Sequence, residues 1–298
     1  MILAAGLGTR LKPLTDRVPK PLVPVGDAPM IAHVAERLRG AGCTPIVTNA
    51  YHHAEAVTRW ATGTSVLVST ETELLGTAGG IAHAAGMLGE GAVLVHNGDV
   101  LVDVDLRDVI RAHEQSDDDA TLVIVSGPAR TGNVGTDVRG RVVRLRTETF
   151  ADGEVSGGEF TGVHVISPRV RASLPGKGCI IGDVYIPRLR TQHGAFQVVV
   201  ARGFVDVGSV AGYLRANQEW LTRRGASFRR SEGAGPSFVA PSAQVDVGVV
   251  LDRSIVGDGA RVTGTGTLAR CVVWPGATVV SPCSDAVIVP SAHSTQVR

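Results

Sequence analysis

Residues 1–11 read MILAAGLGTRL, and residues 19–21 read Pro-Lys-Pro. The apolar start predicts a buried strand, and the glycines after it predict a tight turn. Because this turn has few side chains, its backbone N–H groups can approach an anion closely. Arg10 can donate paired hydrogen bonds to phosphate oxygens, and Lys20 stands between two prolines that restrict its backbone. The stretch therefore predicts a phosphate-binding loop with two cations.

Two better-known phosphate-binding motifs do not fit this stretch. The dinucleotide-binding fingerprint requires a third glycine where this chain has Leu11, and a Walker A loop requires a Gly-Lys-Ser or Gly-Lys-Thr that the stretch lacks. A formal net charge of +1 predicts neither nucleic acid nor membrane binding. The four cysteines are widely scattered, which favours neither a zinc site nor a disulfide framework. We therefore expect a cytoplasmic protein with a local phosphate site.

Strand and helix patterns alternate along the first hundred residues. Residues 29–40 have apolar side chains at helical spacing, with a proline near the start and a glycine at the end. Residues 92–96 form an apolar run that predicts a strand. This alternation predicts an α/β fold with a mainly parallel sheet. After about residue 120 the pattern becomes rich in strands, and residues 209–221 are the last predicted helix.

The C-terminal quarter has a different repeat. Residues 223–235 are basic and rich in glycine, which predicts a linker. From Val239 onward an apolar residue recurs about every six positions, with small residues at the intervening corners. This hexapeptide pattern predicts a parallel β-helix of about three coils rather than a set of ordinary antiparallel strands, whose period would be two.

An acidic residue follows the predicted strand 92–96. The sequence there is Asn97-Gly98-Asp99. A carboxylate at the C-terminal end of a parallel strand points into the crevice where such sheets bind ligands.

These features together resemble the nucleotide-diphospho-sugar pyrophosphorylase family, the sugar-1-phosphate nucleotidyltransferases. Its signature, L-A-A/G-G-x-G-T-R-L with a downstream P-K-P, is present in full. The resemblance implies that Arg10 contacts the leaving pyrophosphate, that Lys20 contacts the transferred phosphate, and that Asp99 binds Mg²⁺. The implied nucleotide-binding residues are Leu3, Ala4, Ala5, Gly6, Gly8, Thr9, Arg10, Glu71, Gly76, Thr77, Asn97 and Gly98.

The second carboxylate implied by the family comes from much later in the chain. Residues 204–209, Phe-Val-Asp-Val-Gly-Ser, resemble the family motif W-x-D-[VT]-G-[TS], with Phe204 in place of the tryptophan. Alone, such a segment is more often a turn followed by a helix cap. Paired with Asp99, Asp206 is the implied second magnesium ligand, since Mg²⁺ prefers hard oxygen ligands.

The base and the sugar depend on two less regular segments. Residues 71–80 resemble E-x-E-P-L-G-T-A-G of mannose-1-phosphate guanylyltransferases, with Leu74 replacing the proline; uridylyltransferases carry a related sequence. On the sugar side the resemblance points to Gly162, Asp183, Tyr185 and Glu148. The lysine of the family motif F-x-E-K-P is missing from the aligned stretch, residues 145–149. Either the sugar is therefore unusual, or Arg144 or Arg146 supplies the charge.

The resemblance implies a complete architecture and activity. We expect a Rossmann-like nucleotidyltransferase domain with a mixed, mainly parallel sheet (1–222), a linker (223–235) and a short left-handed parallel β-helix (236–298). We expect it to transfer NMP, with GMP favoured, from an NTP to a hexose-type sugar 1-phosphate. The alternatives are a uridylyl- or thymidylyltransferase of the same family and a non-catalytic regulatory subunit that binds a nucleotide sugar. The β-helix predicts a homo-oligomer.

Overall fold

The computed structural model describes residues 1–191, 194–224, 235–290 and 295–297. Most of the predicted linker, residues 225–234, therefore lies outside the described residues. The chain divides into two compact units. The first unit contains residues 1–7 and 31–204, and the second contains residues 8–30 and 205–298. The segment with Arg10 and Lys20 thus belongs to the same unit as the C-terminal strands, although it is close in sequence to the first strand.

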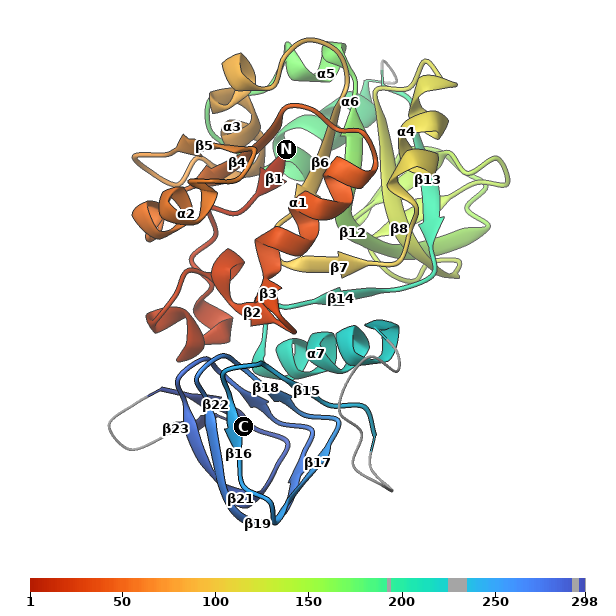
Figure 1. The fold of residues 1–298 in the computed structure, drawn as a ribbon. Helices are drawn as coiled ribbons and strands as arrows, with labels where there is room; N and C mark the ends of the chain where they lie inside the picture. Colours follow the sequence, from red (N-terminus) through yellow and green to blue (C-terminus); the bar gives the residue numbers. More distant parts are fainter. Residues whose placement is uncertain (192–193, 225–234, 291–294, 298) are drawn as a thin grey trace. The chain divides into compact units, whose positions relative to one another are not determined.

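The first unit is built on one large sheet (Figure 1). Its strands are β1 (Ile2–Leu3), β4 (Ile46–Ala50), β5 (Val66–Thr70), β6 (Val93–Asn97), β8 (Ala120–Pro128), β9 (Val134–Thr136), β10 (Val142–Leu145), β11 (Glu148–Thr149), β12 (Ser156–Ile166) and β13 (Phe196–Ala201). The short strand β7 (Val100–Val102) follows β6. The helices are α1 (Met30–Gly40), α2 (Ala54–Ala61), α3 (Gly76–His83), α4 (Leu106–Glu114), α5 (Pro168–Arg171) and α6 (Ile186–Arg190).

Strand β1 lies between β4 and β6 in the sheet. β1 pairs in parallel with β4 on one side and with β6 on the other. In contrast, β12 runs antiparallel to β6, β8 and β9, and β13 is parallel to β8. The predicted mixed α/β sheet is confirmed. Because β1, β4 and β6 are parallel, their carboxyl ends meet at one edge, where ligands bind in sheets of this kind.

Helix boundaries follow local sequence signals. α4 begins after Asp105, whose carboxylate accepts a hydrogen bond from the Arg107 backbone N–H at 2.9 Å. Ser167 caps α5 by accepting a hydrogen bond from the Val170 N–H at 3.4 Å, with Pro168 at the first helical position. Residues Ile180–Tyr185 form a π-helical turn that continues into α6.

The second unit combines a short N-terminal segment with the C-terminal third. It contains the hairpin β2 (Pro24–Val25) and β3 (Ala28–Pro29), helix α7 (Val210–Arg224), and the strands β15 (Phe238–Val239), β16 (Gln244–Val245), β17 (Val249–Asp252), β18 (Ile255–Val256), β19 (Arg261–Ala269), β20 (Val272–Val273), β21 (Thr278–Ser284), β22 (Val287–Val289) and β23 (Thr295–Val297). Strand β14 (Phe204–Asp206) contains the point at which the chain passes from the first unit into the second.

The C-terminal strands pair mainly in parallel. β15, β18, β20 and β22 form one parallel series, and β16, β19 and β21 form another, whereas β22 pairs with β23 in an antiparallel manner. The backbone N–H groups of Ser254 and Cys271 each bond a serine hydroxyl 17 residues earlier, so successive strands stack at that spacing. Val256, Val262 and Leu268, which the six-residue period singled out, are completely buried.

Candidate functional site

The Gly-rich turn after β1 is held by two strands at once. The Gly98 N–H donates to the Leu3 carbonyl at 2.8 Å, which fixes the turn against the end of β6. The Ala4 N–H donates to Oδ1 of Asn49, at the end of β4, at 2.6 Å. The turn therefore lies at the carboxyl edge of the sheet, where its sequence predicted a ligand site.

Asn49 is a site residue that the sequence analysis missed. Its Nδ2 donates to Oε1 of Glu71 at 2.6 Å, and Oε2 of Glu71 accepts from the Leu75 N–H at 3.2 Å. Asn49 and Glu71 are 3% and 4% exposed, so Glu71 is a buried carboxylate that supports the segment from within. The position of Asn49 at the end of an apolar strand was the available signal.

The predicted base segment and the predicted sugar segment meet at the start of α3. The Thr77 hydroxyl accepts a hydrogen bond from the Ile180 N–H at 2.8 Å, and the Ala78 N–H donates to the Gly178 carbonyl at 2.9 Å. Oδ2 of Asp183 accepts from the Cys179 N–H at 2.6 Å and so holds the shape of this turn. Residues about a hundred positions apart in the sequence thus form one surface.

Gly162 on β12 adopts a conformation that only glycine tolerates well. Its φ angle is +80°, and an added Cβ would lie 2.2 Å from Nδ2 of Asn97. The glycine therefore makes room for the Asn97 side chain at the end of β6. This close approach explains the glycine at position 162 within β12.

Tyr185 lies in the core and not on the surface. Its side chain is fully buried, edge-on to Phe196 at 4.8 Å and to His164 at 5.7 Å between ring centroids. Burial also raises the pKa of its phenol well above the ordinary value. We therefore correct the expected sugar contact of Tyr185: desolvation in an aromatic cluster makes it a packing residue.

The charged residues near β10 and β11 differ in how accessible their side chains are to a ligand. Arg144 is largely buried and forms a double hydrogen bond with Glu154, at 2.9 and 3.0 Å, which lowers the pKa of that carboxyl. Arg146 is exposed and points its Nη2 at the Cys179 sulfur, 3.3 Å away. Glu148 accepts two hydrogen bonds of 2.8 Å from Arg190. Of the two candidate arginines, Arg146 is the one that is accessible to a ligand.

In the second unit, Arg10 of the predicted phosphate-binding loop lies close to Asp206. Nη2 of Arg10 lies 3.6 Å from Oδ2 of Asp206, and the two side chains are 72% and 41% exposed. Gly8 has a φ angle of +66°, and its carbonyl accepts a hydrogen bond from the Thr15 hydroxyl at 2.9 Å. Lys20 opens a short 3₁₀ turn, Lys20–Leu22, directly after Pro19.

A buried aromatic pair holds the Lys20 segment against α7. The Tyr213 hydroxyl donates to the Pro24 carbonyl at 2.6 Å and accepts from Nε1 of Trp274 at 2.9 Å. The Gly26 N–H donates to Oδ1 of Asn217, also on α7, at 2.9 Å. The hairpin that follows Lys20 is therefore fixed to the helix that follows Asp206.

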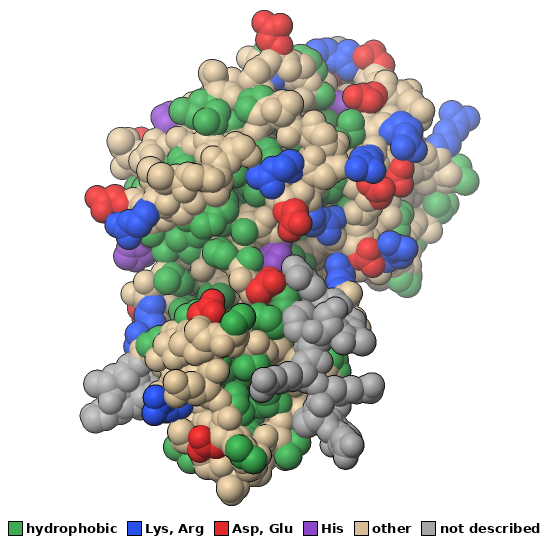
Figure 2. Space-filling view, in the orientation of Figure 1, with side chains coloured by type: hydrophobic (Ala, Val, Ile, Leu, Met, Phe, Trp, Pro, Cys, Tyr) green, Lys and Arg blue, Asp and Glu red, His purple; other side chains and the backbone are tan. Residues whose placement is uncertain are grey.

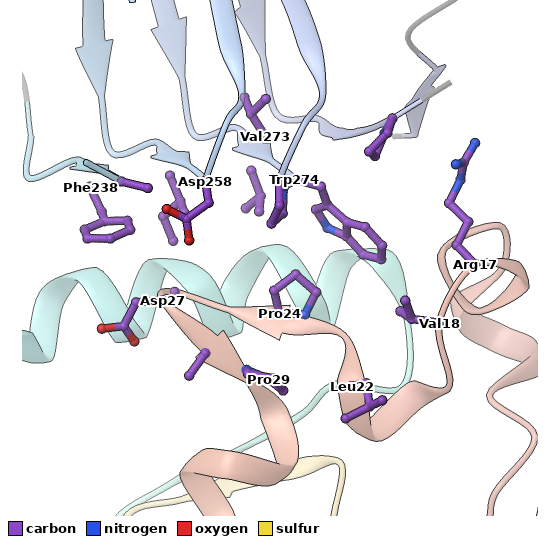
Figure 3. A pocket seen from close by; sticks show the side chains of 18 of the residues that line it. Arg17, Val18, Leu22, Pro24, Asp27, Pro29, Phe238, Asp258, Val273 and Trp274 are labelled. Atoms are coloured by element: carbon purple, nitrogen blue, oxygen red, sulfur yellow. The ribbon is translucent and has the colours of Figure 1, made fainter. Parts of the chain in front are cut away.

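The second unit also contains an apolar cavity of about 600 Å³ between this hairpin and the C-terminal strands. Trp274, Phe238 and several prolines line it, with Arg17 at one end and Asp27 and Asp258 toward the other (Figure 3). Neither Arg10, Lys20 nor Asp206 lines it. The cavity is thus separate from the predicted phosphate site.

Asp99 belongs to the first unit and directly follows Gly98 at the end of β6. Among the described residues, no three His, Cys, Asp or Glu side chains cluster as a metal site made by the protein alone would require. A metal would therefore need oxygen atoms from its substrate or from water to complete its coordination.

On the face shown in Figure 2, Lys and Arg side chains are interspersed with Asp and Glu side chains. No described helix is long and apolar enough to cross a membrane.

Known proteins resemble this chain in sequence and in fold. Residues 1–223 match the nucleotidyl transferase family. The probable mannose-1-phosphate guanylyltransferase 1 of Oryza sativa subsp. japonica is 30% identical over 99% of this chain and 86% of its own length. The mannose-1-phosphate guanylyltransferase of Mycobacterium tuberculosis is 30% identical over 95% of this chain and 81% of its own. The structure of HddC from Yersinia pseudotuberculosis complexed with GMP-PN has a TM-score of 0.61 at 25% identity, covering 74% of this chain and 97% of that one.

Proposed function

We propose that this chain, which belongs to the nucleotidyl transferase family, transfers GMP from GTP to a hexose 1-phosphate and releases pyrophosphate. The similarity to two proteins named as mannose-1-phosphate guanylyltransferases, over nearly the whole of this chain, is the observation that carries the proposal. Mannose 1-phosphate is accordingly the first acceptor to test. A pyrophosphate-release screen of NTPs against sugar 1-phosphates tests both choices.

The reaction is an in-line displacement on phosphorus. An oxygen of the sugar 1-phosphate attacks the α-phosphorus of GTP, a new P–O bond forms, and the bond to pyrophosphate breaks. The protein contributes positioning and charge. Arg10 stabilises charge on the leaving pyrophosphate, and Lys20 stabilises charge on the transferred phosphate. The exposure of Arg10 supports this role, because its guanidinium is accessible to a ligand.

The nucleotide occupies the carboxyl edge around β1. The phosphates lie over the backbone of Leu3, Ala4, Ala5, Gly6, Gly8 and Thr9, and the base and ribose lie over Gly76, Thr77, Asn97 and Gly98. Buried Glu71 belongs to the nucleotide site indirectly, by holding the Leu75 N–H next to Gly76. Two observations support this assignment. Hydrogen bonds join the turn after β1 to the ends of β4 and β6. Gly76 begins α3, and the N-terminus of a helix carries a partial positive charge that favours phosphate.

Nucleotidyltransferases of this family generally use a divalent metal ion. We propose Mg²⁺, held by Asp99 and Asp206. The chemistry of the donors fits this ion, because carboxylate oxygens are hard ligands and Asp206 is accessible. The ion, when bound, neutralises phosphate charge. The guanidinium of Arg10 lies beside the carboxylate of Asp206, so a second positive charge is next to the proposed metal ligand.

The sugar 1-phosphate binds beside Gly162, Asp183 and Glu148. Arg146 supplies the cation that the missing lysine would have provided, since the guanidinium of Arg144 is occupied by Glu154. Tyr185, two residues after Asp183, packs in the core.

We further propose that the catalytic domain covers residues 1–222 and that residues 236–298 form a left-handed parallel β-helix. The parallel pairing at a 17-residue spacing supports a coiled tail. The tail forms the interface of a homo-oligomer, and truncation at Gly235 is expected to abolish association. A cytoplasmic location completes the proposal.

A further inference from the structure

We propose that Asn49 is a positioning residue that locks the phosphate turn to the base segment and thereby sets the affinity for the nucleotide. The inference rests on the proposed function, because it concerns the same nucleotide site. Asn49 is not one of the residues proposed to touch the reacting groups. It acts through Ala4 on one side and through Glu71 and Leu75 on the other.

The chemistry of this position requires a carboxamide. The Ala4 N–H can only donate, and both carboxyl oxygens of Glu71 accept hydrogen bonds, one from Asn49 and the other from the Leu75 N–H. The group between them must therefore accept from one neighbour and donate to the other, which Asn49 does at 2.6 Å in both directions. An aspartate at position 49 could keep the first bond. It would face Glu71 with a like charge in place of the second.

The surroundings leave this arrangement little freedom. Both side chains are almost completely buried, so water cannot easily replace a lost partner. An added Cβ on Gly80 would lie 2.7 Å from Nδ2 of Asn49 and 2.9 Å from Oε1 of Glu71. The helix α3 therefore approaches so closely at Gly80 that a side chain there would displace the pair.

The Asn49–Glu71 pair connects two segments of the proposed nucleotide site. Ala4 begins the turn proposed to hold the phosphates, and Leu75 precedes the Gly76-Thr77 pair proposed to contact the base. With Asn49 in place the two segments keep one separation, and without it each can shift independently. A misplacement of about 1 Å lowers rates by about 10²-fold in positioned sites. The loss should fall on GTP and spare the sugar 1-phosphate.

The experiment exchanges the two functional groups. Asn49→Asp breaks the bond to Glu71. The double variant Asn49→Asp with Glu71→Gln restores it, because the carboxamide introduced at position 71 can donate to the carboxylate introduced at position 49 and still accept from the Leu75 N–H.

Both variants are compared with wild type by KM for GTP, KM for mannose 1-phosphate, kcat, and calorimetric binding of a non-hydrolysable GTP analogue. Val109→Ala, in the buried face of α4 and outside the proposed site, is the control for a purely structural loss.

We expect Asn49→Asp to raise KM for GTP by about 10- to 100-fold with KM for mannose 1-phosphate within about threefold, and the double variant to recover most of the loss. Equal effects on both substrates, or no recovery, would overturn the inference. If Asn49→Asp does not fold, Gly80→Ala replaces it, since its methyl displaces the same pair without removing a polar group. Gly80→Ala with a normal KM for GTP would also overturn it.

Failure of the proposed function has a different signature. In that case wild-type protein releases no pyrophosphate from any substrate pair. The analogue titration still tests the inference, because Asn49→Asp should weaken binding of the GTP analogue and the double variant should recover it. Equal analogue affinity in all variants contradicts the positioning role of Asn49.

Discussion

The guanidinium of Arg10 lies 3.6 Å from the carboxylate of Asp206, although the two residues lie near opposite ends of the proposed catalytic domain, residues 1–222. Both side chains are well exposed, at 72% and 41%. An exposed ion pair of this kind contributes only about 0–1 kcal/mol to folding. Stability therefore accounts for little of this contact, and a shared ligand is the explanation that the proposed function offers.

The first prediction concerns the two carboxylates. Asp99→Asn and Asp206→Asn should each lower kcat by about 10²–10³-fold, as expected for the loss of one electrostatic stabiliser. Because the proposal has both carboxylates hold one ion, the double variant should lose little more than the worse single variant. Steady-state pyrophosphate release at saturating magnesium measures this.

Thermal melting of the same variants is the control. Asp206→Asn should shift the free energy of unfolding by less than about 1 kcal/mol, because its partner is an exposed arginine. Near-normal turnover in Asp206→Asn, or an unfolded protein, would contradict the assignment of Asp206 as a magnesium ligand. Asp206 would then be only a turn residue before α7.

The second prediction concerns the hydroxyl of Tyr213. Tyr213→Phe leaves the Pro24 carbonyl and the Trp274 indole N–H without the partner they share. We expect a loss of about 1–3 kcal/mol in the free energy of unfolding, measured with urea. Trp274→Phe keeps the bond to Pro24 and serves as the comparison. A loss below about 0.5 kcal/mol in Tyr213→Phe would mean that water replaces the hydroxyl.

The third prediction concerns pH. Burial lowers the pKa of His96 to about 4 and that of His164 to about 3. In the unfolded chain both titrate near a pKa of about 6.5. As pH falls below about 6.5, the unfolded chain binds protons that the folded chain does not. Stability is therefore lost between about pH 6.5 and 4 through His96, and between about pH 6.5 and 3 through His164. Each histidine contributes a slope of up to about 1.4 kcal/mol per pH unit.

His164→Phe isolates one of these contributions. Phenylalanine suits the ring cluster, since His164 packs against Phe160 and Tyr185 at centroid distances of 5.5 and 5.7 Å. Unfolding measured between about pH 7 and 5 should show a shallower slope in the variant. An unchanged slope would mean that His164 is not buried neutral in the folded protein.

The fourth prediction concerns association. Val280 on β21 is 66% exposed, and Val247 beside β16 is fully exposed. Substituting lysine at either position should weaken the proposed homo-oligomer, as measured by light scattering at micromolar concentration, without disturbing the packing of α7. Val138→Lys, in the first unit, is the control because that side chain is 84% exposed. A wild-type monomer would contradict the proposed interface.

The sequence was most informative where a pattern repeats or where a motif has a fixed spacing. The apolar run 92–96 became β6, and helical spacing over 29–40 became α1. The six-residue period identified buried positions such as Val262, although the 17-residue spacing of the stacked strands depends on backbone geometry at the corners. Arg253 and Arg270 adopt positive φ angles there, which no propensity predicts.

Side-chain partners were harder to predict, because they depend on which strands become neighbours. Asn49 is the clearest example: its role follows only once β4 pairs with β1. The choice between Arg144 and Arg146 likewise required knowing that Glu154 seals the former. Tyr185 was assigned to the sugar from its motif, whereas the fold turns its ring toward Phe196.

One measurement tests the central claim most directly. Purified protein is incubated with Mg²⁺ and each of GTP, UTP, dTTP, ATP and CTP, crossed with a panel of sugar 1-phosphates that includes mannose 1-phosphate, and pyrophosphate release is followed. The account predicts the highest kcat/KM with GTP and mannose 1-phosphate. A clearly higher value with UTP or dTTP for every sugar would contradict the guanylyl assignment, and no release with any pair would contradict the proposed activity itself.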